Sequence, residues 1–197
     1  MHDIFAHLNL ALVLQLFVLI NPLYSLPYLM AAQRHNINVR RVAVSAVITA
    51  FIIAVIIALF GPFMFNLFGI TLNSLRIAGG IVILLLGLET IRSGVESKSN
   101  VNHIDTMIAI IASPMLTGPA TISFVTIKTY EIGRASMLVN LFAAFILVAV
   151  VFIAFSFVIE RINQRLISIT ARVLGLFLTA VAIEMMARGV QAYIAGT

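Results

Sequence analysis

Two proline elements, 92 residues apart, carry the residues of this chain that are best suited to bind a ligand. The first runs from Asn21 to Pro27 (NPLYSLP) and the second from Ser113 to Pro119 (SPMLTGP). Because proline removes an amide donor and clashes with the preceding turn, each element should interrupt a helix. The free amides after a break suit a carboxylate, and the free carbonyls before it suit an ammonium group or a small cation. The pattern therefore predicts a site for a small zwitterion.

Side chains next to the two breaks add hydroxyl and amide groups. The predicted substrate-binding residues are Asn21, Pro22, Ser25, Pro27, Ser113, Pro114, Thr117, Gly118, Pro119 and Thr121. The alternative is a pair of structural kinks whose hydroxyls bond back to their own helices. The occurrence of two similar elements at corresponding places favours the binding site, because such paired breaks mark the substrate site of many transporters.

Ionisable side chains inside long apolar stretches are costly and usually functional, for example in proton relays. The candidates for coupling to an ion gradient are Arg76, Glu89, Arg172 and Glu184. However, Glu89 lies three residues before Arg92, and Glu184 lies four residues before Arg188, so ordinary ion pairs near helix ends are favoured for both. For the two arginines, snorkelling of the side chain to the interface is favoured.

The composition is that of an integral membrane protein. Hydrophobic residues make up 62% of the 197, charged residues 10%, and the mean hydropathy is +1.14, whereas soluble domains carry about 25% charged residues. The net charge of +5 comes from Lys and Arg scattered at the ends of apolar stretches, which predicts no nucleic-acid partner. With no cysteine and four dispersed histidines, we expect no metal, no cofactor and no enzymatic activity.

Stretches of about 20 apolar residues predict six spans in one all-α transmembrane domain covering residues 1–197. The expected spans cover about 4–32, 42–60, 72–91, 104–127, 137–159 and 167–187. The first and fourth are broken at the proline elements. Re-entrant hairpins at these places are the alternative, and they would change the number of crossings.

The two halves of the chain resemble each other, with repeat one at about 4–95 and repeat two at about 104–194. At an offset of 96 residues Gly79 matches Gly175, whereas at an offset of 95 Gly80 matches Gly175, and both registers stay open. Glycines at seven-residue spacing let two helices approach closely. Because each half has three spans, an odd number, the sequence predicts an inverted-topology repeat.

The distribution of Lys and Arg predicts the orientation. The loops after the first, third and fifth spans, together with the start of the sixth, hold eight of the twelve basic residues. Because basic loops stay in the cytoplasm, we expect both termini outside the inner membrane of the cell.

Three segments resemble the MarC family (UPF0056). They are Asn21-Pro22-Leu23, then Phe68-Gly69-Ile70-Thr71 running into Leu75-Arg76-Ile77-Ala78-Gly79-Gly80, and then Pro114-Met115-Leu116-Thr117-Gly118-Pro119-Ala120-Thr121-Ile122. The resemblance extends over nearly the whole chain. It implies a six-helix inner-membrane protein, some of whose relatives move glycine, alanine and similar small neutral amino acids.

Together, these observations predict a secondary transporter of small neutral solutes that works by alternating access between the two broken helices. Its expected partners are the lipid bilayer and a small-molecule substrate such as glycine or alanine. Coupling to H⁺ or Na⁺ and assembly into a homo-oligomer are left open. The alternatives are a non-transporting membrane scaffold and a small channel.

Overall fold

The computed structural model describes residues 8–34, 37–93, 116–158 and 164–195. Within these ranges the chain is helical and contains no strand. The described helices are α2 (Leu10–Ile20), α3 (Pro22–Arg34), α4 (Val39–Phe68), α5 (Leu72–Ser93), α7 (Pro119–Ile132), α8 (Arg134–Val158) and α9 (Gln164–Ala195). Of these, α4, α5, α8 and α9 are long and apolar enough to cross a bilayer. The all-α class predicted from the sequence is confirmed for this part of the chain.

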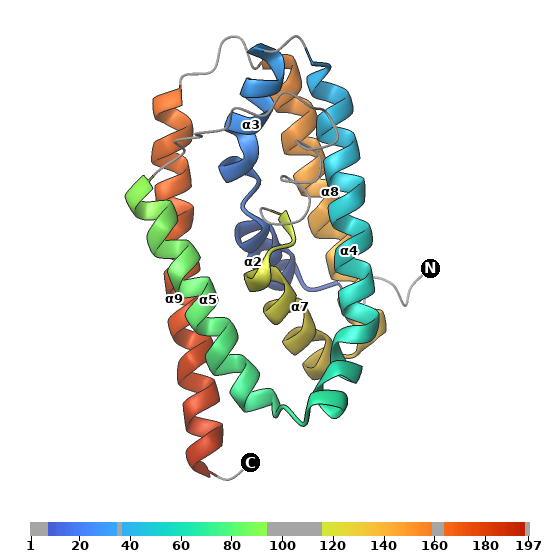
Figure 1. The fold of residues 1–197 in the computed structure, drawn as a ribbon, viewed down its shortest axis with the longest axis vertical. Coiled ribbons are helices and arrows are strands. Elements are labelled where there is room, and N and C mark those ends of the chain that lie inside the picture. Colours follow the sequence, from blue (N-terminus) through green and yellow to red (C-terminus); the bar gives the residue numbers. More distant parts are fainter. Residues whose placement is uncertain (1–7, 35–36, 94–115, 159–163, 196–197) are drawn as a thin grey trace.

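The long helices form two antiparallel pairs with the short helices between them. Figure 1 shows α5 beside α9 on one side of the molecule and α4 beside α8 on the other. The short helix α7 contacts both α4 and α5, and α2 contacts both α8 and α9. The short helices therefore have protein on both sides, which is the arrangement that a helix ending at membrane depth requires.

The start of α2 is fixed by two asparagines. Asn9 caps the helix, because its side-chain oxygen accepts a hydrogen bond of 3.1 Å from the backbone N–H of Leu12. The backbone N–H of Asn9 in turn donates to Oδ1 of Asn140, a buried residue of α8, at 2.7 Å. This side-chain amide therefore fastens the beginning of α2 to the long helix beside it.

Glycines bring α5 and α9 into backbone contact. A Cβ atom on Gly87 would lie 3.0 Å from the carbonyl oxygen of Gly175, and one on Gly175 would lie 3.0 Å from the carbonyl oxygen of Gly87. Seven residues earlier on α5, a Cβ on Gly80 would lie 3.0 Å from the carbonyl oxygen of Ala182. Residue numbers fall along one helix as they rise along the other, so the pair is antiparallel, and only glycine fits the contact.

Several helices extend past the ends that apolar composition predicts. The second predicted span stops at residue 60, but α4 continues through Pro62 to Phe68, where Gly69 takes a φ of +61°. Likewise α7 passes its predicted end at residue 127 and continues to Ile132, before Gly133 with a φ of +84°. The predictions were short because backbone caps end a helix, whereas hydropathy follows only its apolar part.

We expect Gly87→Ala to destabilise the protein by about 1–3 kcal/mol, since overpacking a closely packed contact has that cost. The added methyl would meet the Thr179 side chain at 2.7 Å and the Gly175 backbone at 3.0 Å. Thermal unfolding in detergent micelles, followed by circular dichroism, measures the change. Ala78→Val, on an exposed position of α5, is the control and should leave the midpoint within error. Equal midpoints for the two variants would contradict the close α5–α9 contact.

Candidate functional site

The chain breaks its first long apolar stretch at Asn21. Helix α2 ends at Ile20, and Asn21 takes the left-handed conformation with φ 46° and ψ 63°. In the described residues it is the one non-glycine with positive φ, and asparagine is among the residues that tolerate it best. Helix α3 then begins at Pro22, whose missing amide is no loss at the first helical position. One helix thus ends and the next begins around a single residue.

Three polar side-chain atoms at this junction are buried without a partner in the described part of the chain. Asn21 is 3% exposed and Ser25, one turn into α3, is 0% exposed. Among the described residues, neither amide atom of Asn21 nor the hydroxyl oxygen of Ser25 has a hydrogen-bond partner. An unsatisfied buried polar group costs about 1–3 kcal/mol. Such atoms are therefore expected to meet a ligand or water.

Three other buried hydroxyls of the described chain bond to carbonyls of their own helices. Thr90 donates to the carbonyl oxygen of Leu86, Thr126 to that of Ile122 and Thr129 to that of Val125, each at 2.7 Å. This back-bonding is the common arrangement for hydroxyls in apolar helices. The hydroxyl of Ser25, which has no partner among the described residues, therefore departs from this pattern.

The second junction is the start of α7. Helix α7 begins at Pro119, and Gly118 at the N-cap position supplies no side-chain hydrogen bond to it. Thr117 and Thr121 are both 2% exposed, and the Thr121 hydroxyl donates to the carbonyl oxygen of Leu116 at 3.2 Å. The first amides of a helix have no partner within that helix, so this end can receive an anionic group.

The structure places the two junctions in the middle of the bundle. Figure 1 shows the α2–α3 junction and the beginning of α7 well inside the ends of the long helices, and α2 contacts α7. Of the other predicted binding residues, Pro22 is buried, Pro119 is exposed and Pro27 lies within α3. Ser113 and Pro114 lie outside the described residues.

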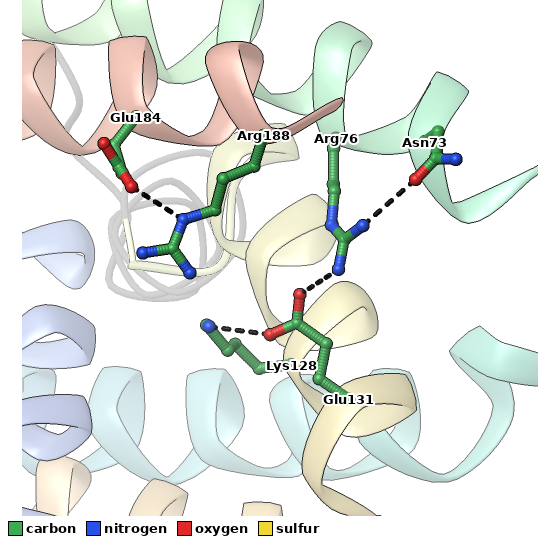
Figure 2. A network of polar contacts seen from close by, with 6 residues as sticks. All are labelled: Asn73, Arg76, Lys128, Glu131, Glu184 and Arg188. Atoms are coloured by element: carbon green, nitrogen blue, oxygen red, sulfur yellow. Dashed lines mark hydrogen bonds and ion pairs between the residues drawn. The ribbon is translucent and has the colours of Figure 1, made fainter. Parts of the chain in front are cut away.

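A second polar feature is a cavity of about 290 Å³ between α2, α5, α7 and α9. It is lined by Gln15, Arg76, Phe124, Ile127, Lys128, Glu131, Ala180, Val181, Glu184, Met185 and Arg188. We call it the charged cavity. Figure 2 shows its charged side chains pointing toward one another from α5, α7 and α9.

Ion pairs cross the charged cavity. Arg76 on α5 contacts Oε1 of Glu131 on α7 at 2.5 Å, and Lys128 contacts Oε2 of the same carboxylate at 2.7 Å. Arg76 also donates to Oδ1 of Asn73 at 3.0 Å. The side chains of Arg76 and Glu131 are only 18% and 23% exposed, so solvent shields their attraction less than at an open surface. This pair ties the end of α7 to the start of α5.

The charged residues predicted from the sequence fall into two groups. The expected i,i+4 pair of Glu184 is confirmed, because its carboxylate binds Nε of Arg188 at 2.7 Å. Arg76 lines the same cavity as Glu184, where it pairs with a carboxylate in addition to any interfacial role. Glu89 and Arg172 are exposed and do not line the cavity. In the described ranges, no three His, Cys, Asp or Glu side chains gather as a metal site.

Sequence reasoning missed Lys128 and Glu131. Both lie beyond the predicted end of the fourth span, where charged residues are read as an ordinary loop. Their spacing of three residues, with opposite charges, was the available signal that a helix continues there.

The family model of the MarC integral membrane proteins matches residues 6–194. This chain belongs to the MarC family. It is 29% identical to a UPF0056 membrane protein of Methanocaldococcus jannaschii over 189 residues, covering 89% of this chain and 92% of the relative. A UPF0056 membrane protein of Buchnera aphidicola from Schizaphis graminum is 30% identical over 187 residues, covering 89% and 88%. No solved structure matches significantly.

Membership of the MarC family establishes a multi-pass integral membrane protein. The names of the relatives describe membrane proteins and carry no activity. The family resemblance seen in the three sequence segments is confirmed.

We expect a double-mutant cycle of Arg76→Gln and Glu131→Gln to give a coupling energy of about 1 kcal/mol or more, because these side chains are largely shielded. The matched cycle of Glu184→Gln and Arg188→Gln joins side chains that are 62% and 63% exposed, and should give about 0.5 kcal/mol or less. Denaturant unfolding in micelles measures both. A larger coupling for the exposed pair would contradict this assignment.

Proposed function

We propose that this MarC protein is a secondary transporter of small neutral solutes, with small amino acids as the substrate class. The observation that carries the proposal is the junction at Asn21, where three buried polar atoms lack partners in the described part of the chain. A fold that only had to be stable would gain by satisfying or removing them. Their retention is typical of a site whose partner is a ligand that comes and goes.

The chemistry of the junction suits a zwitterion. The Asn21 amide offers both a donor and an acceptor, and the Ser25 hydroxyl offers either. The end of α2 presents carbonyls, which suit an ammonium group, and the start of α7 presents amides, which suit a carboxylate. Among the described residues no ionised side chain is buried at the junction, which favours a neutral solute such as glycine or alanine.

An inverted repeat is part of the proposal, with its halves at about 4–95 and 104–194. The α5–α9 contacts support the offset of 95 over that of 96. At an offset of 95, Gly80 corresponds to Gly175 and Gly87 to Ala182. The contact of Gly87 with Gly175 then corresponds to that of Ala182 with Gly80, and both contacts are present. A twofold axis in the membrane plane exchanges the two halves of the chain, so it requires each such contact to occur twice in this way.

In this proposal six spans cross the inner membrane, both termini lie outside, and the two halves rock about the shared site. A gradient of H⁺ or Na⁺ supplies the driving force. The protein performs no covalent chemistry, and no nucleic acid is involved.

The decisive experiment is uptake into liposomes that contain the purified protein. We expect labelled glycine, alanine or serine to accumulate under an imposed H⁺ or Na⁺ gradient, with saturation and with counterflow. A channel would conduct without counterflow, and a scaffold would show no uptake. Absence of uptake for all three solutes under both gradients would overturn the proposal.

We expect Ser25→Ala to raise stability while lowering uptake. The substitution removes a buried hydroxyl that has no partner in the described chain and adds the best helix former, so the free energy of unfolding should rise by about 1 kcal/mol. Uptake should fall about tenfold if the hydroxyl binds substrate. Thr126→Ala is the control, because it removes a hydroxyl that bonds to the Ile122 carbonyl. Unchanged uptake by Ser25→Ala would count against the junction as the site.

A further inference from the structure

The charged cavity holds more positive than negative charge. Its cations are Arg76, Lys128 and Arg188, and its carboxylates are Glu131 and Glu184. The remaining walls include apolar side chains such as those of Phe124 and Met185. One positive charge is thus left over in a space of about 290 Å³, and apolar walls focus the field of such a charge toward an incoming anionic group.

Donors remain free on the two cations that face this space. Arg188 bonds Glu184 through Nε, and Figure 2 shows one of its two terminal nitrogens pointing toward Lys128. Within the described chain these terminal nitrogens have no ion-pair partner. Lys128 gives one of its three donors to Glu131. A carboxylate between these two side chains would receive charge-assisted hydrogen bonds from both.

An acceptor for a cationic group lies next to these donors. Oε1 of Glu184 binds Arg188, and the second oxygen of the same carboxylate takes part in no ion pair with the described residues. Glu131 differs, because each of its two oxygens already has a cationic partner. The cavity therefore offers cationic donors beside one carboxylate oxygen, which is the charge pattern that a zwitterion matches.

The cavity also lies on the way to the junction. Gln15, on its wall, precedes Asn21 by six residues, which is about 9 Å along a helix. At the opposite end of the charged cavity, Glu131 is in the last turn of α7, at the end of the bundle where α5 begins. The charged cavity thus reaches from that end of the bundle toward the depth of the helix break.

We propose that the charged cavity is a separate binding site for a small zwitterionic molecule, with Arg188 and Lys128 holding its carboxylate and Glu184 its ammonium group. The statement that this molecule is also the transported solute rests on the proposed function, whereas its binding in the charged cavity does not. A lipid phosphate shares the affinity for the cations. The phosphate of an anionic lipid fits less well, because it brings no cationic group for the second oxygen of Glu184.

Cysteine labelling tests this site directly, because the chain has no cysteine of its own. The full-length Gln15→Cys protein in phosphatidylcholine nanodiscs is exposed to a membrane-impermeant maleimide. We expect the label to react, and glycine to slow the reaction. Acetate and methylammonium each carry one of the two charges, so each should need a concentration about tenfold higher for equal protection. Ala180→Cys, at another lining position, provides a second reporter.

A second substitution in the cysteine protein tests which side chains are needed for glycine to slow the labelling. Arg188→Gln and Lys128→Gln should each raise the glycine concentration for half-protection about tenfold. Arg172→Gln, which removes an exposed cation of α9 outside the cavity, should leave it unchanged. Asn21→Gly, which keeps the left-handed backbone and deletes the side chain, should also leave it unchanged. If liposomes showed no solute uptake while glycine still slowed the labelling, the proposed transport would be overturned, but the binding site in the charged cavity would not.

Three results would overturn the inference. The first is no protection by glycine with either reporter. The second is protection that persists in Arg188→Gln and Lys128→Gln but disappears in Asn21→Gly, since the ligand would then act from the helix junction. The third is protection by added phosphatidylglycerol in the nanodisc and not by glycine, which would assign the cavity to a lipid headgroup.

Discussion

A bilayer offers no water to a backbone amide or carbonyl, and the arrangement of the helices follows from this constraint. The long helices α4, α5, α8 and α9 meet it mainly by hydrogen bonding within each helix, which is interrupted in α4 at Pro62. The short helices α2, α3 and α7 cannot, because new helices begin at Pro22 and Pro119 well inside the bundle. They lie between the two pairs of long helices, where protein covers the end of α2 and the starts of α3 and α7. The junction at Asn21 thus lies where protein rather than lipid surrounds the backbone groups that the helix ends leave free.

Helix α7 connects the two polar regions of the protein. Its first residue follows Gly118 at the depth of the junction, and its last turn carries Glu131 in the charged cavity. Fourteen residues separate these ends, or about 21 Å. Along its middle, Gly61 of α4 and Gly79 of α5 lie closer to α7 than any larger residue would allow. A movement of α7 that released Arg76 at one end would therefore also move the uncapped amides at the other.

Local chemistry made part of this structure predictable. Pro22 marks a helix start because of its own geometry, and the pair of Glu184 with Arg188 follows from a spacing of one helical turn. The bond between Arg76 and Glu131 could not be predicted in this way, since 55 residues separate them and only packing brings them together. The repeat register that we propose rests on packing for the same reason. Nor does a sequence show that the polar atoms of Asn21 lack partners among the described residues, because this depends on all their neighbours at once.

The contact between α5 and α9 restricts how the molecule can change shape. Because each glycine lacks a side chain, the backbone of the other helix packs directly against it, as at Gly87 and Gly175. Sliding by a single residue would bring a side chain against a carbonyl oxygen, so the two helices are locked in register and lose their relative translation. The helices α5 and α9 are therefore expected to move together as one rigid unit. In any conformational change, sliding between helices must therefore occur where α2, α3 and α7 contact the long helices. The contacts there are fewer, and polar groups can exchange partners.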